Sequence, residues 1–486
     1  MKDSLQIEED RKTLEGFGYQ QELSRTLNFF SNFGVAFTYL SPVVGFYSLY
    51  AFGFQTGGPA FFWGIPIVVI GQLLVTLIFS ELAGTFPIAG ALYQWGRRLM
   101  GHTYGWFLGW IYGWALLVTI TAVDYGGSPY VASLLGLQNP SQASLIGITL
   151  VMVVIQTFAN FVGVQRLKVL INLGIAMEVI GTLGISIVLL FFHHQQAGMI
   201  FTTQQVQGHG NYFPIFMIAL LFSGFIFYGF ESAADVAEEV VDPQRRVPKA
   251  MITALVIGGV TTMLTVVAFL YATPDMALAL NAAKTPDPVD YILTSNLGAG
   301  VSRLFLLVVA LAFLSCGAAV QTAATRVFFS YARDKAIFGH KFFSYVHPRF
   351  KTPTNALWIS AIIALLLSLS AKFESILTSF AVVGIYLAFQ MVVLAAMIAR
   401  SKGFQPTGRF QLRGWFWPVA ILGFVYGVSM IVNLARPTNP TVPWYLNYEV
   451  ILATVAIIVI GVIVKALHNI AKQKDDGQET SSSIGQ

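Results

Sequence analysis

The stretch that decides the fold is Phe222–Ala250, FSGFIFYGFESAADVAEEVVDPQRRVPKA. It begins as an apolar, aromatic segment in which Gly224 and Gly229 weaken a helix, and it then carries Glu231 and Asp235. Charge is costly at membrane depth, and a broken helix persists there only where its freed backbone is covered by protein or lines a watery cavity. The stretch therefore predicts a wall of a binding site. The alternative is a kinked structural helix with a buried glutamate.

The whole chain has the composition of a polytopic membrane protein. Of its 486 residues, 56% are hydrophobic and 10% are charged, and the mean hydropathy is +0.68. Soluble domains carry about 25% charged residues. The one cysteine, Cys316, excludes a disulfide or a cysteine metal cluster within the chain. We expect neither a cofactor nor a metal.

Twelve apolar stretches have about the 20 residues that a membrane-spanning helix needs. They lie at 27–51, 60–85, 103–133, 143–163, 168–192, 212–236, 249–272, 300–332, 353–371, 375–399, 413–434 and 446–467. The predicted fold is therefore all-α. Residues 1–26 form a polar segment, 27–400 a ten-helix core, 413–467 two added helices, and 468–486 a disordered tail.

The basic residues orient this bundle, because Lys and Arg are retained on the cytoplasmic side. With the N-terminus inside, 24 of the 28 basic residues fall in cytoplasmic segments, and only Lys284, Arg303, Lys372 and Arg436 do not. Both termini are then cytoplasmic. The net charge of +5 follows from membrane topology, so we expect a lipid bilayer and no nucleic acid as partner.

The first helix repeats the interruption of the sixth. In FTYLSPVVGFYSLY, Pro42 removes a backbone donor and Gly45 follows it. The first and sixth helices cross the membrane in opposite directions, and paired interruptions of this kind are typical of an inverted repeat. We expect helices one to five and six to ten to be the two repeats.

Three motifs carry a resemblance to a known family. They are EGFGYQQELSRTLNFFSNFGVAFTYLSPVVG, FSELAGTFPIAGALYQW and ESAADVAEEVVDPQRRVPKA. Together they resemble the amino-acid–polyamine–organocation transporter superfamily, and within it the branch of γ-aminobutyrate and choline permeases. The resemblance implies a leucine-transporter-type fold, a substrate site between helices one and six, and secondary active uptake of an amino acid across the cytoplasmic membrane. Permeases for polyamines or choline, and amino-acid exchangers, are alternatives of the same fold.

The broken ends predict the substrate contacts. Free N–H groups at a half-helix N-terminus suit a carboxylate, so the amides of Val44, Gly45 and Phe46 should hold one, with Ser41 and Val43 lining the gap. The freed carbonyls of residues 225–228 should accept from an ammonium. The family likeness makes Phe225 an aromatic lid. The full predicted substrate set is Ser41, Val43, Val44, Gly45, Phe225, Phe227, Tyr228, Gly229 and Gln321.

Buried acids predict coupling and gating. Glu178 lies ten residues into the fifth helix, about 15 Å deep, where desolvation favours the neutral acid and permits proton exchange near neutral pH. Several family members carry a Lys there instead. The alternative is a permanently neutral structural carboxyl. Glu231 and Asp235, one turn apart, are predicted gating residues.

Other polar positions leave alternatives open. Asp124 could attract a cationic amine in a vestibule or be an ordinary solvated residue near the outer face. The cytoplasmic residues Glu238, Glu239, Asp242, Arg245 and Arg246 could form a salt-bridged latch or a solvated loop. Sodium coupling would use helix eight, where Ser315, Cys316, Ala318 and Ala319 form a weak ligand set.

Two other classes of function compete with transport. An intramembrane enzyme would need a metal set or an activated nucleophile, but the histidines fall in loops or at helix ends and no HExxH or GxSxG occurs. A channel fits paired broken helices and an aromatic lid less well than alternating access does. The sequence therefore predicts a transporter, not an enzyme, with a small amino acid or amine as substrate and protons as the coupling ion.

Overall fold

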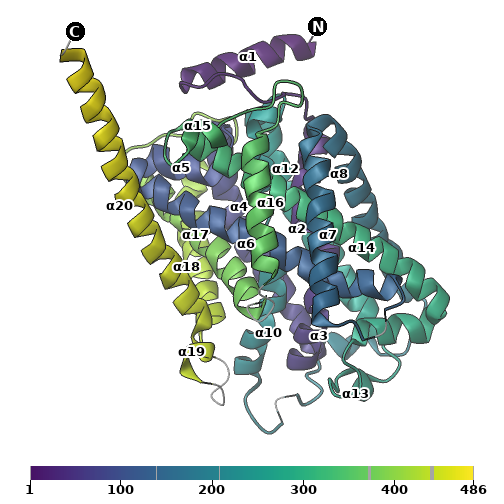
Figure 1. Cartoon of the computed structure of the whole chain (residues 1–486). Coiled ribbons are helices and arrows are strands. Elements are labelled where there is room, and N and C mark those ends of the chain that lie inside the picture. Colours follow the sequence, from purple (N-terminus) through teal and green to yellow (C-terminus); the bar gives the residue numbers. More distant parts are fainter. Residues whose placement is uncertain (1, 138, 207, 370–373, 438–442, 485–486) are drawn as a thin grey trace.

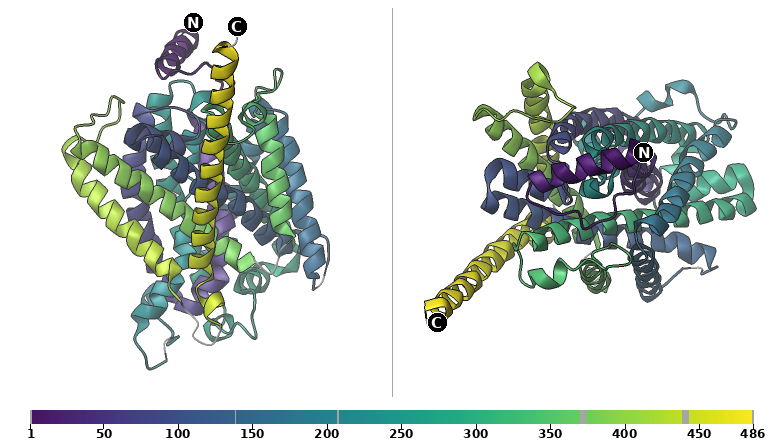
Figure 2. Two further views of the ribbon diagram at one scale, coloured as in Figure 1. Left: turned by 60° about the vertical axis from the view of Figure 1, so that its left-hand side comes forward. Right: turned by 90° about the horizontal axis from the view of Figure 1, so that it is seen from above.

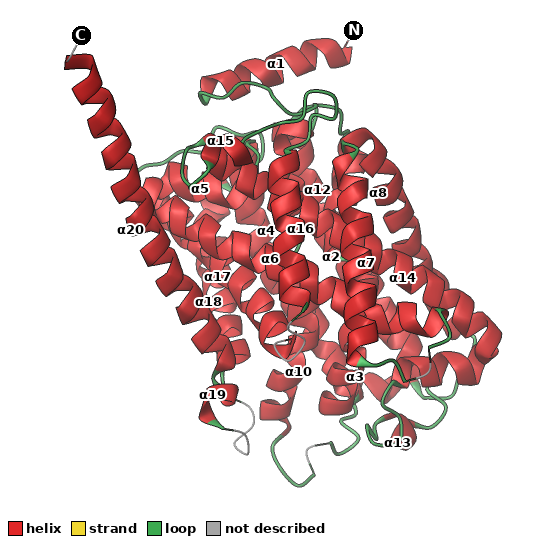
Figure 3. Cartoon of the chain, in the orientation of Figure 1, coloured by secondary structure: helices red, strands yellow, loops and turns green. Residues whose placement is uncertain are grey.

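The computed structural model describes residues 2–137, 139–206, 208–369, 374–437 and 443–484. Helices joined by loops make up the described chain (Figure 3). Within it, ten helices are long and apolar enough to cross a membrane. Two shorter apolar helices, α10 (Tyr212–Ile226) and α16 (Thr354–Ser368), lie where the sixth and ninth spans are predicted. The chain is an all-helical, multi-pass membrane protein.

The first half of the chain holds the first break. The spans are α2 (Phe29–Leu40) with α3 (Pro42–Gly57), α4 (Gly64–Thr85), α6 (His102–Leu134), α7 (Gln142–Phe161), and α8 (Val164–Val179) continued by the π segment η2 (Ile180–Gly184) and α9 (Ile185–Leu189). The short helix α5 (Ala91–Met100) connects α4 to α6. Ser41 separates α2 from α3 with a left-handed backbone at φ 41°. Pro42 fits directly after it because the first position of a helix needs no N–H donor.

The second half holds the second break. After α10 come α11 (Ser232–Asp235), α12 (Pro243–Tyr271), α13 (Met276–Ala279), α14 (Pro288–Arg333), α15 (His340–Phe343), α16, α17 (Glu374–Ser401), α18 (Phe416–Ala435), α19 (Trp444–Asn447) and α20 (Glu449–Ile484). Gly298 interrupts α14 with φ 78°.

Four features differ from the predicted elements. The sixth helix is interrupted as predicted, but its inner half is shorter than the span to residue 236 implies, because α10 ends at Ile226 and only the single turn α11 and a 3₁₀ turn, η4 (Ala237–Glu239), follow. Helix eight begins twelve residues earlier than predicted, at Pro288. The N-terminal segment contains helix α1 (Lys2–Gly16), and α20 continues to Ile484 through most of the tail predicted to be disordered.

The arrangement separates a packed core from an outer layer. α6 packs against α14, α17 and α5, while α12 packs against α4 and α2. Both chain ends lie at one end of the bundle, where α1 crosses it, and α20 runs along the outside (Figures 1 and 2). Apolar side chains of α20 such as Val455, Val459 and Ile463 are half exposed. Such a surface suits lipid, whereas buried polar side chains collect inside.

Close packing of α6 on α14 depends on Gly109. A Cβ atom there would lie 2.3 Å from Cε2 of Tyr331. The Tyr331 ring is held by Tyr93, 4.2 Å away between centroids, and its hydroxyl donates to the carbonyl of Trp106. The ring therefore has little freedom to move aside.

We predict opposite effects of alanine at two helical glycines. Gly109→Ala should destabilise the protein by about 1–3 kcal/mol through overpacking. Gly147→Ala, in α7 with nothing within 4 Å of the new Cβ, should be neutral or stabilising because alanine favours helix by about 1 kcal/mol. Thermal unfolding of the detergent-purified variants measures this. Equal melting temperatures would contradict the packing argument.

Candidate functional site

The N-terminus of α3 is capped by Glu178 from α8. The Ser41 hydroxyl donates to one carboxyl oxygen of Glu178, and the Val43 N–H donates to the other at 3.0 Å. The Val44 N–H donates to Ser41 Oγ at 3.2 Å. Because the free amides of a helix N-terminus attract negative charge, a carboxyl group fits there. It is a carboxyl group of the chain itself, at the place predicted for one from a substrate.

Of the three amides predicted to hold a substrate carboxylate, those of Val44 and Gly45 donate to Ser41 in this structure. The Gly45 N–H donates to the Ser41 carbonyl at 3.0 Å. A Cβ at Gly45 would meet Ile226 at 2.3 Å, so the glycine allows α3 to approach α10. Val43 packs against Gly181 of η2, where a Cβ would lie 2.6 Å away. Gly45 and Val43 thus have packing roles in this structure.

The π segment η2 begins two residues after Glu178 and contacts its backbone. The Thr182 hydroxyl donates to the Glu178 carbonyl at 2.6 Å. π-Bulges occur often at functional sites because they shift side chains relative to a regular helix. Gly174, one turn earlier, would place a Cβ 2.8 Å from Thr38 of α2 and 2.9 Å from Ser315 of α14. Because Gly174 has no side chain, α8 approaches α2 and α14 closely enough for Glu178 to reach the break.

At the second break, two carboxyl groups contact the hydroxyl of one tyrosine. Glu231 accepts from the Gly229 N–H at 2.9 Å and from the Tyr112 hydroxyl at 3.2 Å. The same hydroxyl lies 2.7 Å from Asp235 Oδ2. All three side chains are fully buried. Tyr112 has one hydroxyl proton, so it donates to one carboxyl at a time. The structure brings together the two predicted gating acids, and it adds Tyr112 of α6, for which the sequence offered no signal.

The remaining predicted residues of the second break line the contact between the two breaks. Gly229 has φ 101°, and a Cβ there would lie 2.9 Å from the Leu40 N–H nitrogen. The Tyr228 ring meets the edges of Tyr39 and Phe225 at centroid distances of 6.1 and 5.8 Å. Phe227 is fully buried, so it packs inside the protein and does not face lipid. The two unwound segments are in van der Waals contact.

Two predicted positions lie elsewhere. The Gln321 amide donates to Thr157 Oγ1 at 2.8 Å and accepts from Asn160 at 3.0 Å, so it joins α14 to α7. Asp124 is fully buried and accepts from Gln156 of α7 at 2.7 Å. It is therefore neither a vestibule residue nor a solvated one, because its face of α6 turns toward α7 and α14.

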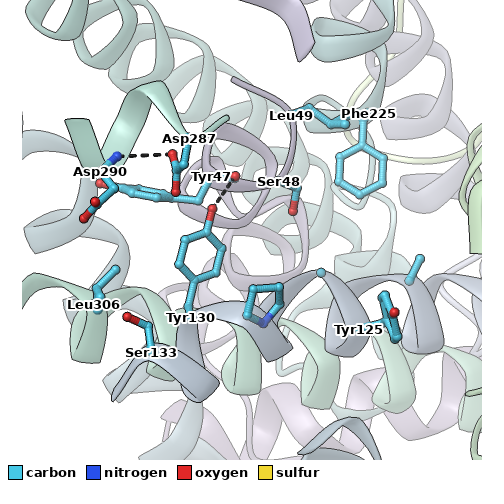
Figure 4. A pocket seen from close by; sticks show the side chains of 13 residues that line it. Tyr47, Ser48, Leu49, Tyr125, Tyr130, Ser133, Phe225, Asp287, Asp290 and Leu306 are labelled. Carbon is cyan, nitrogen blue, oxygen red and sulfur yellow. Dashed lines mark hydrogen bonds between the residues drawn. The ribbon is translucent and has the colours of Figure 1, made fainter. Parts of the chain in front are cut away.

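A cavity of about 500 Å³ is lined by residues of α3, α6, α10 and the start of α14. In Figure 1, α3 lies toward the end of the bundle away from the chain ends. Of the predicted substrate residues, Phe225 lines the cavity. In Figure 4, Tyr47, Tyr130, Asp287 and Asp290 gather on one side of the cavity, with Phe225 and Ser48 on the other. The further lining residues are Leu49, Ala122, Tyr125, Gly126, Pro129, Ser133 and Leu306. Sequence reasoning missed the two aspartates because they lie before residue 300, in a segment taken for a loop.

Asp287 and Asp290 begin α14. Asp287 Oδ1 accepts from the N–H groups of Val289 and Asp290 at 2.9 and 3.1 Å. Asp290 accepts from the Thr294 hydroxyl at 3.2 Å. Burial raises the pKa of Asp287 above its ordinary value, the neighbouring Asp290 charge raises it further, and the two N–H contacts oppose this.

Ion pairs close the opposite end of the bundle. Arg333 binds Glu238 at 2.7 and 2.9 Å, and Arg326 binds Glu239 at 2.8 and 3.3 Å. Arg25 donates to the Val240 carbonyl at 2.7 Å. The sequence left open whether these acids form a salt-bridged latch or a solvated loop. The two glutamates form salt bridges, and their partners are arginines of α14 instead of Arg245 and Arg246 of the loop.

Two broken helices that meet beside a buried carboxyl, with a cavity at one end and ion pairs at the other, define a membrane transporter. The chain belongs to the amino acid permease family, whose model matches residues 27–463. Proteins of this family are transporters and not enzymes.

Several relatives match over most of their length. The amino-acid permease BAT1 of Arabidopsis thaliana is 25% identical over 90% of each chain, and its homolog in Oryza sativa is 28% identical over 90% of this chain and 89% of its own. A GABA-specific permease of Saccharomyces cerevisiae is 22% identical over 90% of this chain and 80% of its own. Distant relatives also include a choline and a polyamine transporter of that yeast.

The buried ion pairs predict strong, coupled effects on stability. Arg326 and Glu239 are 1% and 0% exposed, so Arg326→Gln should cost about 3–5 kcal/mol by leaving a buried carboxylate unpaired. Glu239→Gln/Arg326→Gln should lose less than the two single changes added together. As a control, Arg409→Gln removes the 3.9 Å pair between the exposed Arg409 and Asp242 and should cost at most about 1 kcal/mol. Thermal unfolding in detergent measures all four. Strict additivity would contradict the paired assignment.

Proposed function

We propose that the protein is a secondary active transporter that takes up an amino acid or a similar small molecule, such as γ-aminobutyrate, coupled to protons. It would act in the cytoplasmic membrane with both termini inside. Its fold would comprise twelve spans, with helices one to ten as two inverted repeats and the last two appended. The family membership supports an amino-acid or amine substrate, and the positions of the two breaks support the repeat.

The observation that carries the coupling proposal is the carboxyl of Glu178 at the N-terminus of α3. When ionised, this carboxylate would be held there by one hydroxyl and one amide. Protonation removes its charge and weakens that hold, because charge-assisted hydrogen bonds are about twice as strong as neutral ones. The Val43 amide and Ser41 hydroxyl then become available to a substrate carboxylate. Proton binding and substrate binding would thus favour each other at one helix end.

Sodium coupling has weaker support in the same region. The Ser315 hydroxyl donates within its own helix to the Leu311 carbonyl at 2.8 Å. The next residue offers a thiol, which donates to the Tyr39 carbonyl at 3.4 Å. Sodium, like other hard cations, prefers oxygen ligands, so this set favours protons over sodium.

The second candidate is a permease for organic cations such as polyamines or choline. It is favoured by the fact that Glu178 already supplies a carboxyl group to α3, so that a substrate without a carboxylate would meet no competition there. Glu231 and Asp235 at the second break would then attract the cation. An exchange mode of either permease would use the same residues.

Closure at the chain ends fits one state of an alternating-access cycle. The ion pairs of Glu238 and Glu239 with α14 seal the proposed cytoplasmic side, while the cavity beside Phe225 lies on the opposite side. Glu231 and Asp235, in the short inner half of helix six, stand between the two together with Tyr112 of α6. We propose that their shared hydroxyl contact breaks when the inner side opens.

Glu178→Gln tests the coupling proposal. Glutamine keeps the shape and the capacity to accept hydrogen bonds but stays neutral, so the variant should bind and exchange substrate while losing concentrative, pH-dependent uptake. Wild-type uptake into liposomes should rise as external pH falls, need no sodium, and weaken when the proton gradient is collapsed.

The matched control is Glu15→Gln, which removes an exposed carboxylate of α1 and should keep the wild-type pH profile. Accumulation by Glu178→Gln with the wild-type pH profile would make Glu178 structural and would move coupling elsewhere.

A ligand screen separates the two substrate classes. Amino acids, γ-aminobutyrate, polyamines and choline should be compared by thermal shift, since a bound ligand raises apparent stability. If α3 holds a substrate carboxylate, amidating the best ligand should reduce affinity roughly ten- to a hundredfold. Choline or a polyamine binding as well as any amino acid would instead favour the organic-cation permease.

A further inference from the structure

We propose that the cavity beside Phe225 is a binding site for an organic ammonium group, distinct from the carboxyl-binding end of α3. The proposal rests on the proposed function in one respect, that the cavity belongs to the transport path. It adds a site built from Tyr47 of α3, Tyr130 of α6, and Asp287 and Asp290 before and within α14. The hydrogen bonds described at the two helix breaks do not involve these four residues.

The charge of the cavity has one sign. Among the thirteen residues lining it, the two charged ones, Asp287 and Asp290, are both acidic. Their hydrogen bonds to described residues engage Oδ1 of each carboxylate, through the N–H groups that begin α14 and the hydroxyls of Thr294 and Ser302. The second oxygen of each carboxylate, Oδ2, receives no bond in that set. Two carboxylates with spare acceptor capacity favour a cation over an anion.

An independent observation comes from Tyr47. Its side chain lines the cavity and is 4% exposed, yet its hydroxyl has no hydrogen-bond partner among the described residues. A buried hydroxyl without a partner is unfavourable. It lies on the same side of the cavity as the two aspartates (Figure 4). An ammonium group, with up to three N–H donors, would supply both the hydroxyl and the carboxylates with a donor.

The aromatic lining selects an organic cation over a metal ion. Tyr47 and Tyr130 meet edge to face at a centroid distance of 5.9 Å, and the Tyr130 hydroxyl is fixed by the Tyr47 carbonyl at 2.6 Å. Tyr125 and Phe225 line the same cavity. Aromatic rings attract alkylammonium groups through their faces. A volume of about 500 Å³ is also far larger than a single metal ion needs.

The test uses putrescine, which carries two ammonium groups and no carboxylate, and its neutral counterpart 1,4-butanediol. Equilibrium binding to the purified full chain is measured by calorimetry, in potassium chloride and in sodium chloride of equal strength. Asp287→Asn/Asp290→Asn should weaken putrescine binding at least tenfold, and Tyr47→Phe should weaken it severalfold. Asparagine is as good a helix N-cap as aspartate, so the fold should be retained, and melting temperature without ligand verifies this.

The matched control is Asp275→Asn, which changes another N-cap aspartate, bonded to the Leu278 N–H at 3.0 Å, outside the cavity lining. It should leave putrescine affinity unchanged. The proposal is overturned if putrescine does not bind the wild type, if butanediol binds equally well, if the double variant binds like the wild type, or if sodium selectively displaces putrescine. Calorimetry measures binding and not transport, so the two proposals can fail separately. If putrescine binds but no substrate is taken up, the proposed uptake function fails. If putrescine does not bind but uptake is unaltered, only the ammonium site fails.

Discussion

The arrangement of the core depends on one electrostatic contact, the carboxyl of Glu178 at the N-terminus of α3. A helix that starts in the middle of a membrane leaves amides with no partner, and hydrocarbon offers none. Here a residue 135 positions away supplies the acceptor. The contact also fixes α8 against α2, because the approach passes through Gly174, where a side chain would meet Thr38 and Ser315. Removing the charge of Glu178 therefore affects both the hydrogen bonding of the α3 backbone and the packing of α8 against α2.

The two ends of the bundle are built from different interactions. At the end that carries both termini, buried arginine–carboxylate pairs join the segment after α11 to α14. A protein loses much stability when one partner of such a pair is removed, yet the replacement of both partners by apolar residues is often tolerated. Such pairs are consequently suited to form and break as units. At the other end, tyrosines and two aspartates surround a cavity, which leaves polar groups able to receive a ligand.

Buried acids in this protein have distinct surroundings, and these suggest distinct roles. Glu178 caps a helix, Glu231 and Asp235 share the Tyr112 hydroxyl, and Asp124 faces Gln156. Asp124 Oδ1 and Gln156 Oε1 both lie within 3 Å of the position that a Cβ of Gly317 would occupy. This crowding explains why α14 has a glycine there. It also identifies Asp124 as part of the helix contact, away from the cavity.

The sequence by itself determined the all-helical membrane class, the approximate positions of the apolar helices, the two breaks and the family, because hydropathy, Pro42 and the glycines act locally. It also indicated that Glu178 would be buried, since a rise of 1.5 Å per residue sets depth. Only the tertiary structure decided what each side chain meets. It turned Gln321 and Asp124 toward α7, gave Glu238 and Glu239 arginines of α14, and placed Glu178 on the Val43 amide, at the helix end expected to hold a substrate. The rotation of each helix about its axis decides these contacts, and that rotation follows from close packing at small residues far apart in the chain.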